Sequence, residues 1–139
     1  MMIELTAATF PSADRFNYIN CTSEPSPVKA VPVRIEIQPD MVSGDVIELQ
    51  TRGFSDSDGT QPVPGTQTSF VHVLGSIDAR KFVELIIRPY ATAIKPIKSG
   101  SLDAKYSVKR KGDLIGTSKR ALVKLDLKMP GGGTCPEGQ

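Results

Sequence analysis

The sequence predicts an all-β fold, a sandwich of about seven antiparallel strands, from three observations. Apolar and polar residues alternate with a period of two through residues 31–129, which places one face of each strand on a core and the other in water. Turn-forming residues separate these runs at intervals of roughly ten positions. No window keeps the period of about 3.6 residues that marks an amphipathic helix. Short strands at this spacing over about 100 residues are typical of an immunoglobulin-like sandwich.

The strand predictions follow the alternation along the chain. In chain order, the strands are expected at residues 31–37, 47–51, 70–74, 82–88, 102–109, 114–118 and 121–129. The turn before the second strand contains Gly44 and Asp45, residue types that favour turns. The stretch 52–65, rich in Gly, Pro and Asp, is expected to be a long loop. Pro89 and Pro96 bracket a kinked passage between the fourth and fifth strands.

Two regions fall outside this domain of residues 31–129. Residues 1–30 are predicted to form an extended arm, because closely spaced prolines favour extended backbone. Scattered apolar side chains, among them Phe10, Phe16 and Tyr18, indicate that the arm packs on something, either its own domain or a neighbouring copy. The last ten residues, 130–139, are expected to form a flexible tail that does not pack on a core.

Composition restricts the kinds of function that fit the chain. One His and no Trp leave few groups for acid–base chemistry near neutral pH, so we expect a protein that is not an enzyme and uses no cofactor. The chain has no apolar stretch of about eighteen residues, so we expect no membrane span. Its first residues lack the pattern of a secretory signal.

Positive charge is concentrated late in the chain. The formal net charge is +2, and residues 95–128 contain ten basic and three acidic side chains. A basic region of this kind suits an acidic partner or a phosphate backbone. The lysines occupy alternate positions, however, which is the pattern of the solvent-facing sides of strands. We therefore expect no nucleic-acid partner.

Four local motifs each lack a part that their chemistry needs. Residues 56–59 open like a calcium loop, but the glycine comes fourth rather than sixth, so a polar turn without a metal is expected. The glycines at 131–133 precede no helix that would bind a phosphate. His72 has no nucleophile motif near it, so it is expected to be an ordinary strand residue. The sequon at 20–22 matters only for a secreted chain.

Cys21 and Cys135 lie near the two ends of the chain. A disulfide needs Cα atoms within about 7 Å of each other, and nothing in the sequence enforces that proximity. Without a secretory signal, reduced thiols are the prediction, and the pairing of the two cysteines stays open at this point.

Tyr106 is predicted to have a structural role. It lies on a late strand, where sandwich domains often carry a Tyr whose hydroxyl bonds to a nearby backbone group, the tyrosine corner. The edge strands of a sandwich also need protection from pairing with other chains. Pro32 and four lysines on outer faces suit that purpose; these lysines are Lys105, Lys109, Lys124 and Lys128.

Two runs of residues carry a resemblance to a known family. The turn Gly44-Asp45 opens an early strand, and a Gly-x-Leu-x-Ala-x-Tyr-x-Val run begins at Gly100. Both resemble motifs of bacterial immunoglobulin-like repeat domains, many of which have Trp at the position of Thr51. The resemblance covers roughly residues 31–127. It implies structural roles for Gly44, Asp45 and Gly100, and binding or display without catalytic residues.

Members of this family occur in long adhesive surface proteins and, as single domains, on phage particles. A single domain with its own start Met and no export signal fits the second setting. We therefore expect a phage virion accessory protein of the capsid-decoration type, located on the virion and assembled in the host cytoplasm. Its expected partner is a capsid or other virion protein, bound through the sandwich edge or through the arm, where Phe10, Phe16 and Tyr18 are the expected contact residues. The arm is also the expected route to a homo-oligomer, by capping an edge strand of a neighbouring copy.

The alternative is an extracellular adhesion or carbohydrate-binding module of a bacterial surface protein. Such a module would contact a glycan through loops such as residues 53–66. Glycan sites usually present exposed aromatic side chains, and this loop has only Phe54, at its edge.

Overall fold

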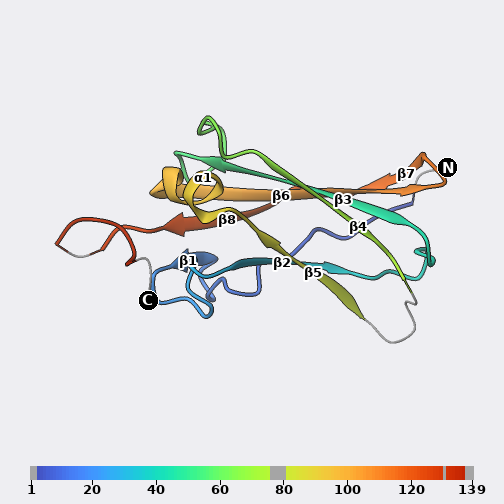
Figure 1. The fold of residues 1–139 in the computed structure, drawn as a ribbon, viewed down its shortest axis with the longest axis horizontal. Coiled ribbons are helices and arrows are strands. Elements are labelled where there is room, and N and C mark those ends of the chain that lie inside the picture. Colours follow the sequence, from blue (N-terminus) through green and yellow to red (C-terminus); the bar gives the residue numbers. More distant parts are fainter. Residues whose placement is uncertain (1–2, 76–80, 130, 137–139) are drawn as a thin grey trace.

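The computed structural model describes residues 3–75, 81–129 and 131–136. In this part of the chain it has eight strands, and it confirms the predicted all-β sandwich (Figure 1). In chain order the strands are β1 (Tyr18–Asn20), β2 (Val31–Glu36), β3 (Val46–Phe54), β4 (Thr68–Val73), β5 (Phe82–Ile87), β6 (Ser99–Arg110), β7 (Asp113–Thr117) and β8 (Ala121–Asp126).

The seven predicted strands correspond to β2 through β8. β3 continues to Phe54, into the stretch expected to be a loop. The kinked passage between Pro89 and Pro96 contains a helical turn, α1 (Tyr90–Ala93), and a 3-10 turn, η1 (Lys95–Ile97). β1 lies within the arm, where the sequence predicts no strand.

The strands divide unevenly between two sheets. The larger sheet has the order β1-β8-β6-β3-β4, and the smaller contains β2 and β5. β6 is long enough to pair with β8 along its first half and with β7 along its second, so β7 and β8 share one side of β6. β1 lies parallel to β8, whereas the other paired strands are antiparallel. Immunoglobulin domains divide about four strands against three, whereas here six described strands face two.

The core lies between the two sheets. The alternating apolar residues of each strand point into it, as the period of two predicts. The fully buried side chains include Ile47 and Leu49 of β3, Leu102, Tyr106 and Val108 of β6, Val123 and Leu125 of β8, and Val31, Val33 and Ile35 of β2.

Two glycines are required by the backbone geometry. Gly44 has φ +94°, a left-handed conformation that favours glycine, and its N–H bonds to the carbonyl of Leu74. A Cβ at Gly100 would lie 2.0 Å from the carbonyl oxygen of Phe54. Both glycines therefore occupy positions where a side chain would strain or displace the backbone.

The described part of the arm packs on its own domain. Leu5, Ala8, Phe10 and Ile19 are buried in the same core as the strands. Of the two arrangements that the sequence left open, the structure shows the first. Phe10 is only 9% exposed, which corrects the expectation that it contacts a partner. The cause is its aromatic ring, which is stabilised by burial in the nearest core.

The C-terminal segment also differs from the expected tail. Its glycines 131–133 all have left-handed φ values, and they form a turn in which Gly132 N–H bonds to Met129 and Met129 N–H to Gly133. The turn carries the chain back, and Cys135 is buried in the core. Residues 130 and 137–139 of the predicted tail lie outside the described residues.

Cys21 and Cys135 form a disulfide with Cα atoms 5.4 Å apart, so the prediction of reduced thiols is wrong. β1 runs parallel to β8, with Asn20 opposite Asp126, and therefore delivers Cys21 to the end of β8. The C-terminal turn brings Cys135 to the same place. Neither the parallel pairing nor the turn has a local sequence pattern, which is why spacing alone did not predict the bond.

Candidate interaction surfaces

Residues 3–10, here called the closing segment, join the two sheets along one side of the sandwich. Ile3 N–H donates to the carbonyl of Ile115 on β7 at 2.7 Å, and Leu5 forms a parallel bridge with Ser118. Thr9 exchanges two backbone hydrogen bonds with Arg34 of β2. In Figure 1 the segment runs from the N-terminus beside β7 toward β2. It therefore covers an edge of each sheet.

A buried triangle of hydrogen bonds fixes the middle of the closing segment. The Tyr106 hydroxyl donates to the carbonyl of Thr6 at 2.5 Å, and Gln38 Nε2 donates to the same hydroxyl at 3.0 Å. Thr6 N–H donates to Gln38 Oε1 at 2.9 Å. Burial raises the pKa of Tyr106 above its usual value. The hydroxyl thus bonds to backbone one hundred residues away, which differs from the nearby bond of a tyrosine corner.

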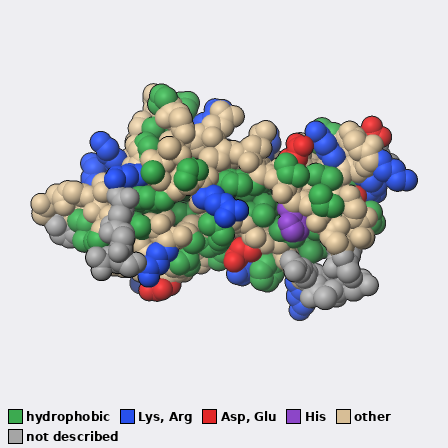
Figure 2. Space-filling view, viewed as in Figure 1, with side chains coloured by type: hydrophobic (Ala, Val, Ile, Leu, Met, Phe, Trp, Pro, Cys, Tyr) green, Lys and Arg blue, Asp and Glu red, His purple; other side chains and the backbone are tan. Residues whose placement is uncertain are grey.

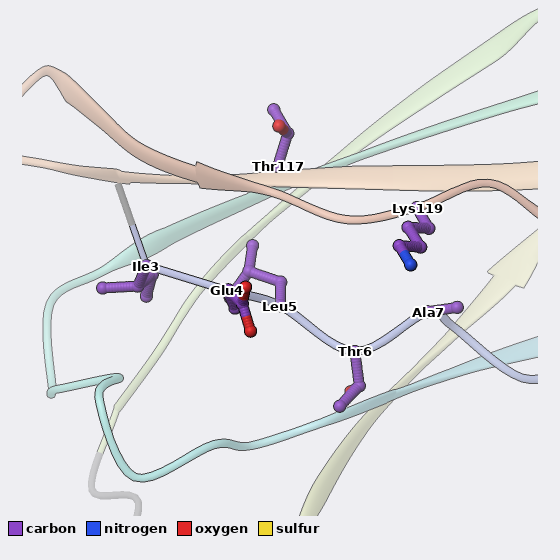
Figure 3. A pocket seen from close by; sticks show the side chains of 7 residues that line it. All are labelled: Ile3, Glu4, Leu5, Thr6, Ala7, Thr117 and Lys119. Atoms are coloured by element: carbon purple, nitrogen blue, oxygen red, sulfur yellow. The ribbon is translucent and has the colours of Figure 1, made fainter. Parts of the chain in front are cut away.

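A shallow pocket lies beside the closing segment (Figure 3). Residues 3–7 line one wall, and Thr117 and Lys119 line the other. Its ionisable side chains, Glu4 and Lys119, are both exposed to solvent. In the described ranges no group of three metal-ligating side chains occurs.

Residues 14–18, here called the Phe16 turn, are held by a dense set of hydrogen bonds. The Asp14 carboxylate accepts the N–H groups of Phe16 at 2.8 Å and of Tyr18 at 3.0 Å. Asn17 N–H bonds to the Asp14 carbonyl, and Asn17 has φ 65°. Asn and Asp tolerate such conformations better than other side chains. The sequence thus builds a tight turn with Phe16 near its tip.

Two further hydrogen bonds attach the Phe16 turn to β8. The Asn17 side chain donates to the carbonyl of Leu122 at 2.9 Å, and Lys124 N–H donates to the carbonyl of Asn17 at 3.0 Å. Phe16 is 65% exposed and Tyr18 is 38% exposed. Phe16 and Tyr18 are two of the three residues that the sequence singled out in the arm.

Cationic side chains lie over both exposed aromatic rings of the turn. The Arg15 guanidinium is 4.9 Å from the centroid of Phe16, and the Lys124 ammonium is 5.2 Å from that of Tyr18. A cation within about 6 Å of a ring is attracted to its face. The turn therefore presents a mixed aromatic and positively charged surface.

The opposite side of the sandwich has a different surface. β4 pairs with β3 only, and β5 with β2 only, among the described strands. Val71 and Val73 of β4 are 63% and 59% exposed. The face shown in Figure 2 includes the histidine of β4, with hydrophobic side chains beside it. His72 is half-buried there, an ordinary strand position.

An ion pair fixes the turn that precedes β3. Asp45 is fully buried and accepts two hydrogen bonds from the Arg110 guanidinium, at 2.8 and 3.0 Å. These bonds lower the pKa of Asp45, with a further contribution from the N–H of Val42. Asp45 therefore ties β3 to the end of β6, a structural role.

Residues 56–61 form a closed polar turn. The Asp56 carboxylate accepts the hydroxyl of Thr60 and the N–H groups of Thr60 and Gln61. The Thr60 hydroxyl is the main cause that lowers the pKa of Asp56 to about 2. Because the oxygens already have partners within the turn, this geometry agrees with the predicted polar turn.

The loop that would contact a glycan presents no exposed aromatic ring. Phe54 is buried, and the Arg120 guanidinium lies 4.8 Å above its ring. Arg120 also bonds to Asp103 at 2.8 Å. Burial raises the pKa of Asp103, although Arg120 opposes the shift. Phe54 and Arg120 thus hold the loop against β6 and β8.

No protein-family model, curated protein or solved structure matches the chain. The resemblance to bacterial immunoglobulin-like repeat domains therefore stays a prediction. Among the described residues, no helix is long and apolar enough to cross a membrane.

The sequence identified Phe16 and Tyr18 but missed the residues that position them. Asp14 and Asn17 make most of the hydrogen bonds of the Phe16 turn. Both are typical turn formers, so a turn at residues 14–17 was a signal available in the sequence. The open edge of β4 was also missed, because strand order cannot be derived from alternation alone.

Proposed function

We propose that this protein is a non-enzymatic accessory protein of a virion that attaches to a capsid or other virion protein through the Phe16 turn. The observation that carries the proposal is an exposed phenylalanine on a turn fixed by six hydrogen bonds, four within the turn and two to β8. An exposed aromatic side chain on a rigid support is typical of binding residues.

Preorganisation supports this assignment. A side chain already held in its bound position loses little conformational entropy on association. The exposed Phe16 and Tyr18 give apolar area, while Arg15 and Lys124 supply positive charge beside it. Such a surface suits a partner with an apolar depression rimmed by carboxylates.

The disulfide is compatible with a virion setting. Disulfides are rare in reducing cytosol but persist on virions and cell surfaces. A chain that assembles in the host cytoplasm with free thiols would form the Cys21–Cys135 bond after release of the particle, where dissolved oxygen accepts the two electrons and two protons that the thiols lose. The expected place of the mature protein is therefore the outside of the particle.

The proposal predicts a capsid gene beside this reading frame, and shells assembled from the product of that gene provide the test. The full chain is mixed with these shells, and co-sedimentation gives the bound fraction. We expect wild-type chain to bind and Phe16→Ser to bind at least about tenfold more weakly. Leu114→Ser is the matched control, since Leu114 is an exposed apolar residue on β7. Full binding by Phe16→Ser, or no binding by the wild type, overturns the proposal.

The disulfide also favours a second candidate, an extracellular adhesion or carbohydrate-binding module at a bacterial cell surface, where such bonds are common. Secretion genes beside the reading frame, with binding of the wild-type chain on a glycan array, would support this candidate. The buried position of Phe54 removes the one aromatic ring of its expected glycan loop, so the virion function is the one we favour.

A further inference from the structure

We propose that β4 is a self-pairing edge, which joins β4 of a second copy of this chain in antiparallel register with Val71 opposite Val71 of that copy. The larger sheets of two copies would then form one continuous sheet. This surface lies apart from the Phe16 turn, so the proposal does not depend on the proposed function.

The direction of the free backbone groups of β4 follows from known hydrogen bonds. Ser118 N–H donates to the carbonyl of Tyr106, so the backbone of Tyr106 faces β7. Along an antiparallel strand, successive residues direct their N–H and C=O groups to opposite sides. The neighbours Lys105 and Ser107 therefore face β3, where they are opposite Gln50 and Glu48.

The same alternation continues through β3 to β4. Since Gln50 and Glu48 face β6, the residue between them, Leu49, faces β4, where it lies opposite Phe70. Phe70 and His72 thus bond to β3. The hydrogen bond from Leu74 N–H to the carbonyl of Asp45 at 2.8 Å agrees with this assignment, because Leu74 lies two residues after His72 and also bonds toward the β3 side.

Three residues of β4 are left facing outward. Ser69, Val71 and Val73 direct their N–H and C=O groups away from β3, and no described strand pairs with that side. The side chains of the same three residues are exposed. Unpaired backbone groups beside exposed valines are a template for another strand.

The charge pattern favours a second copy as the occupant. In a two-fold symmetric strand pair, the residue at the axis lies opposite the same residue of the second copy, and the residues around it come from the same strand sequence. A charged residue can therefore face a like charge, and like charges placed opposite each other are destabilising. β4, with the sequence TSFVHV, has no Lys, Arg, Asp or Glu, whereas the neighbouring open edge of β5 contains Glu84. β4 also lacks the Pro and Lys that protect natural edges.

One register uses all of the outward-facing groups. With the axis at Val71, Val71 bonds to Val71 of the second copy, and Ser69 bonds to Val73 in both directions. An axis at Phe70 or His72 would pair only two of these three residues, because Ser69 would then lie opposite Val71, or Val71 opposite Val73, and the third would have no partner in β4. The interface is small, so we expect weak association, which becomes effective where copies are concentrated on one surface.

The first test is sedimentation of the full chain over a wide concentration range. We expect reversible dimers at high concentration. Val71→Lys places two ammonium groups opposite each other and should weaken the dimer at least about tenfold. Leu114→Lys, the same change at an exposed residue of β7, should leave it unchanged. A wild-type chain that stays monomeric at all concentrations overturns the proposal. The β4 edge would then be available to a strand of another protein.

The second test reads the register by cross-linking. Residues opposite each other in a hydrogen-bonded antiparallel pair have Cα atoms about 5.5 Å apart, within disulfide range. The native cysteines are already paired, so a new cysteine is the free thiol. Val71→Cys should form a covalent dimer on mild oxidation. Val73→Cys, almost equally exposed, should not, because its mate is Ser69. Equal cross-linking of the two variants contradicts the proposed register.

Discussion

The edge strands on the two sides of the sandwich differ in whether another part of the chain pairs with them. On one side, residues 3–5 and β1 continue the larger sheet beyond β7 and β8, and Thr9 pairs with the outer edge of β2. On the other side, β4 and β5 have no second partner among the described strands. The difference shows that the chain uses residues 3–20 to close one side of its own core and leaves the other available for contact.

The closed side should carry most of the stability. Phe10→Ala removes a ring that is buried in the core, and we expect a loss of about 3 to 5 kcal/mol in the free energy of unfolding. Val71→Ala on the open side should change it by no more than about 0.5 kcal/mol. Urea unfolding of both variants makes the comparison, and equal losses would show that the two sides do not differ.

The disulfide should be the next largest contribution. It links positions 114 residues apart and therefore restricts the unfolded chain strongly. Cys21→Ser should lower the free energy of unfolding by about 2 to 5 kcal/mol. Urea unfolding with and without reductant checks this, since reductant should destabilise the wild type and leave the variant unchanged. An unaffected wild type would mean that the ends of the chain are held by other contacts.

Tyr106→Phe should have an intermediate effect. It leaves the carbonyl of Thr6 and the buried amide of Gln38 without their shared partner, at a cost of about 1 to 3 kcal/mol.

Because the pKa of Tyr106 is raised in the folded state, its contribution is fully present below pH 10 and is lost as pH rises further. Unfolding free energies measured between pH 8 and pH 11 should therefore fall less steeply in the variant. Identical slopes would contradict the buried triangle.

The smallest expected effect concerns the Asp45–Arg110 pair. The pKa of Asp45 is lowered in the folded state from 3.8, so its contribution is present above about pH 4 and is lost as pH falls through the folded value. The partly exposed guanidinium limits the size of the effect through solvent screening. Thermal unfolding of Asp45→Asn should be less sensitive to acid than that of the wild type. Equal acid sensitivity would exclude this pair as a source of acid lability.

The sequence predicted β2 to β8 well because each of these strands has its own local pattern. The alternation of residues 102–109 and the glycine of the turn at 111–113 are sufficient to place β6 and the start of β7. The closing segment has no such pattern, and its position depends on bonds to residues distant in sequence, which range from Arg34 and Gln38 to Tyr106 and Ser118. The disulfide was missed for the same reason, because it depends on the parallel pairing of β1 with β8.

The candidate surfaces could be predicted only in part. Phe16 and Tyr18 stand out in the sequence as apolar residues in a polar arm, but Phe10 has the same appearance and is buried. Exposure depends on which face of the folded arm meets the core. Val71 and Val73 look like ordinary core residues of a strand, and they are exposed because they lie opposite Glu48 and Val46 on the outer face of the larger sheet.

Residue-resolved amide hydrogen exchange tests the difference between the two sides most directly. It is measured on the chain at a concentration where sedimentation shows a monomer. We predict that the amides of Thr9, Phe70 and His72 exchange slowly, because they are hydrogen-bonded, and that those of Val71 and Val73 exchange almost as fast as in an unfolded chain. Slow exchange at Val71 in the monomer, or fast exchange at Thr9, would contradict a sandwich closed on one side and open on the other.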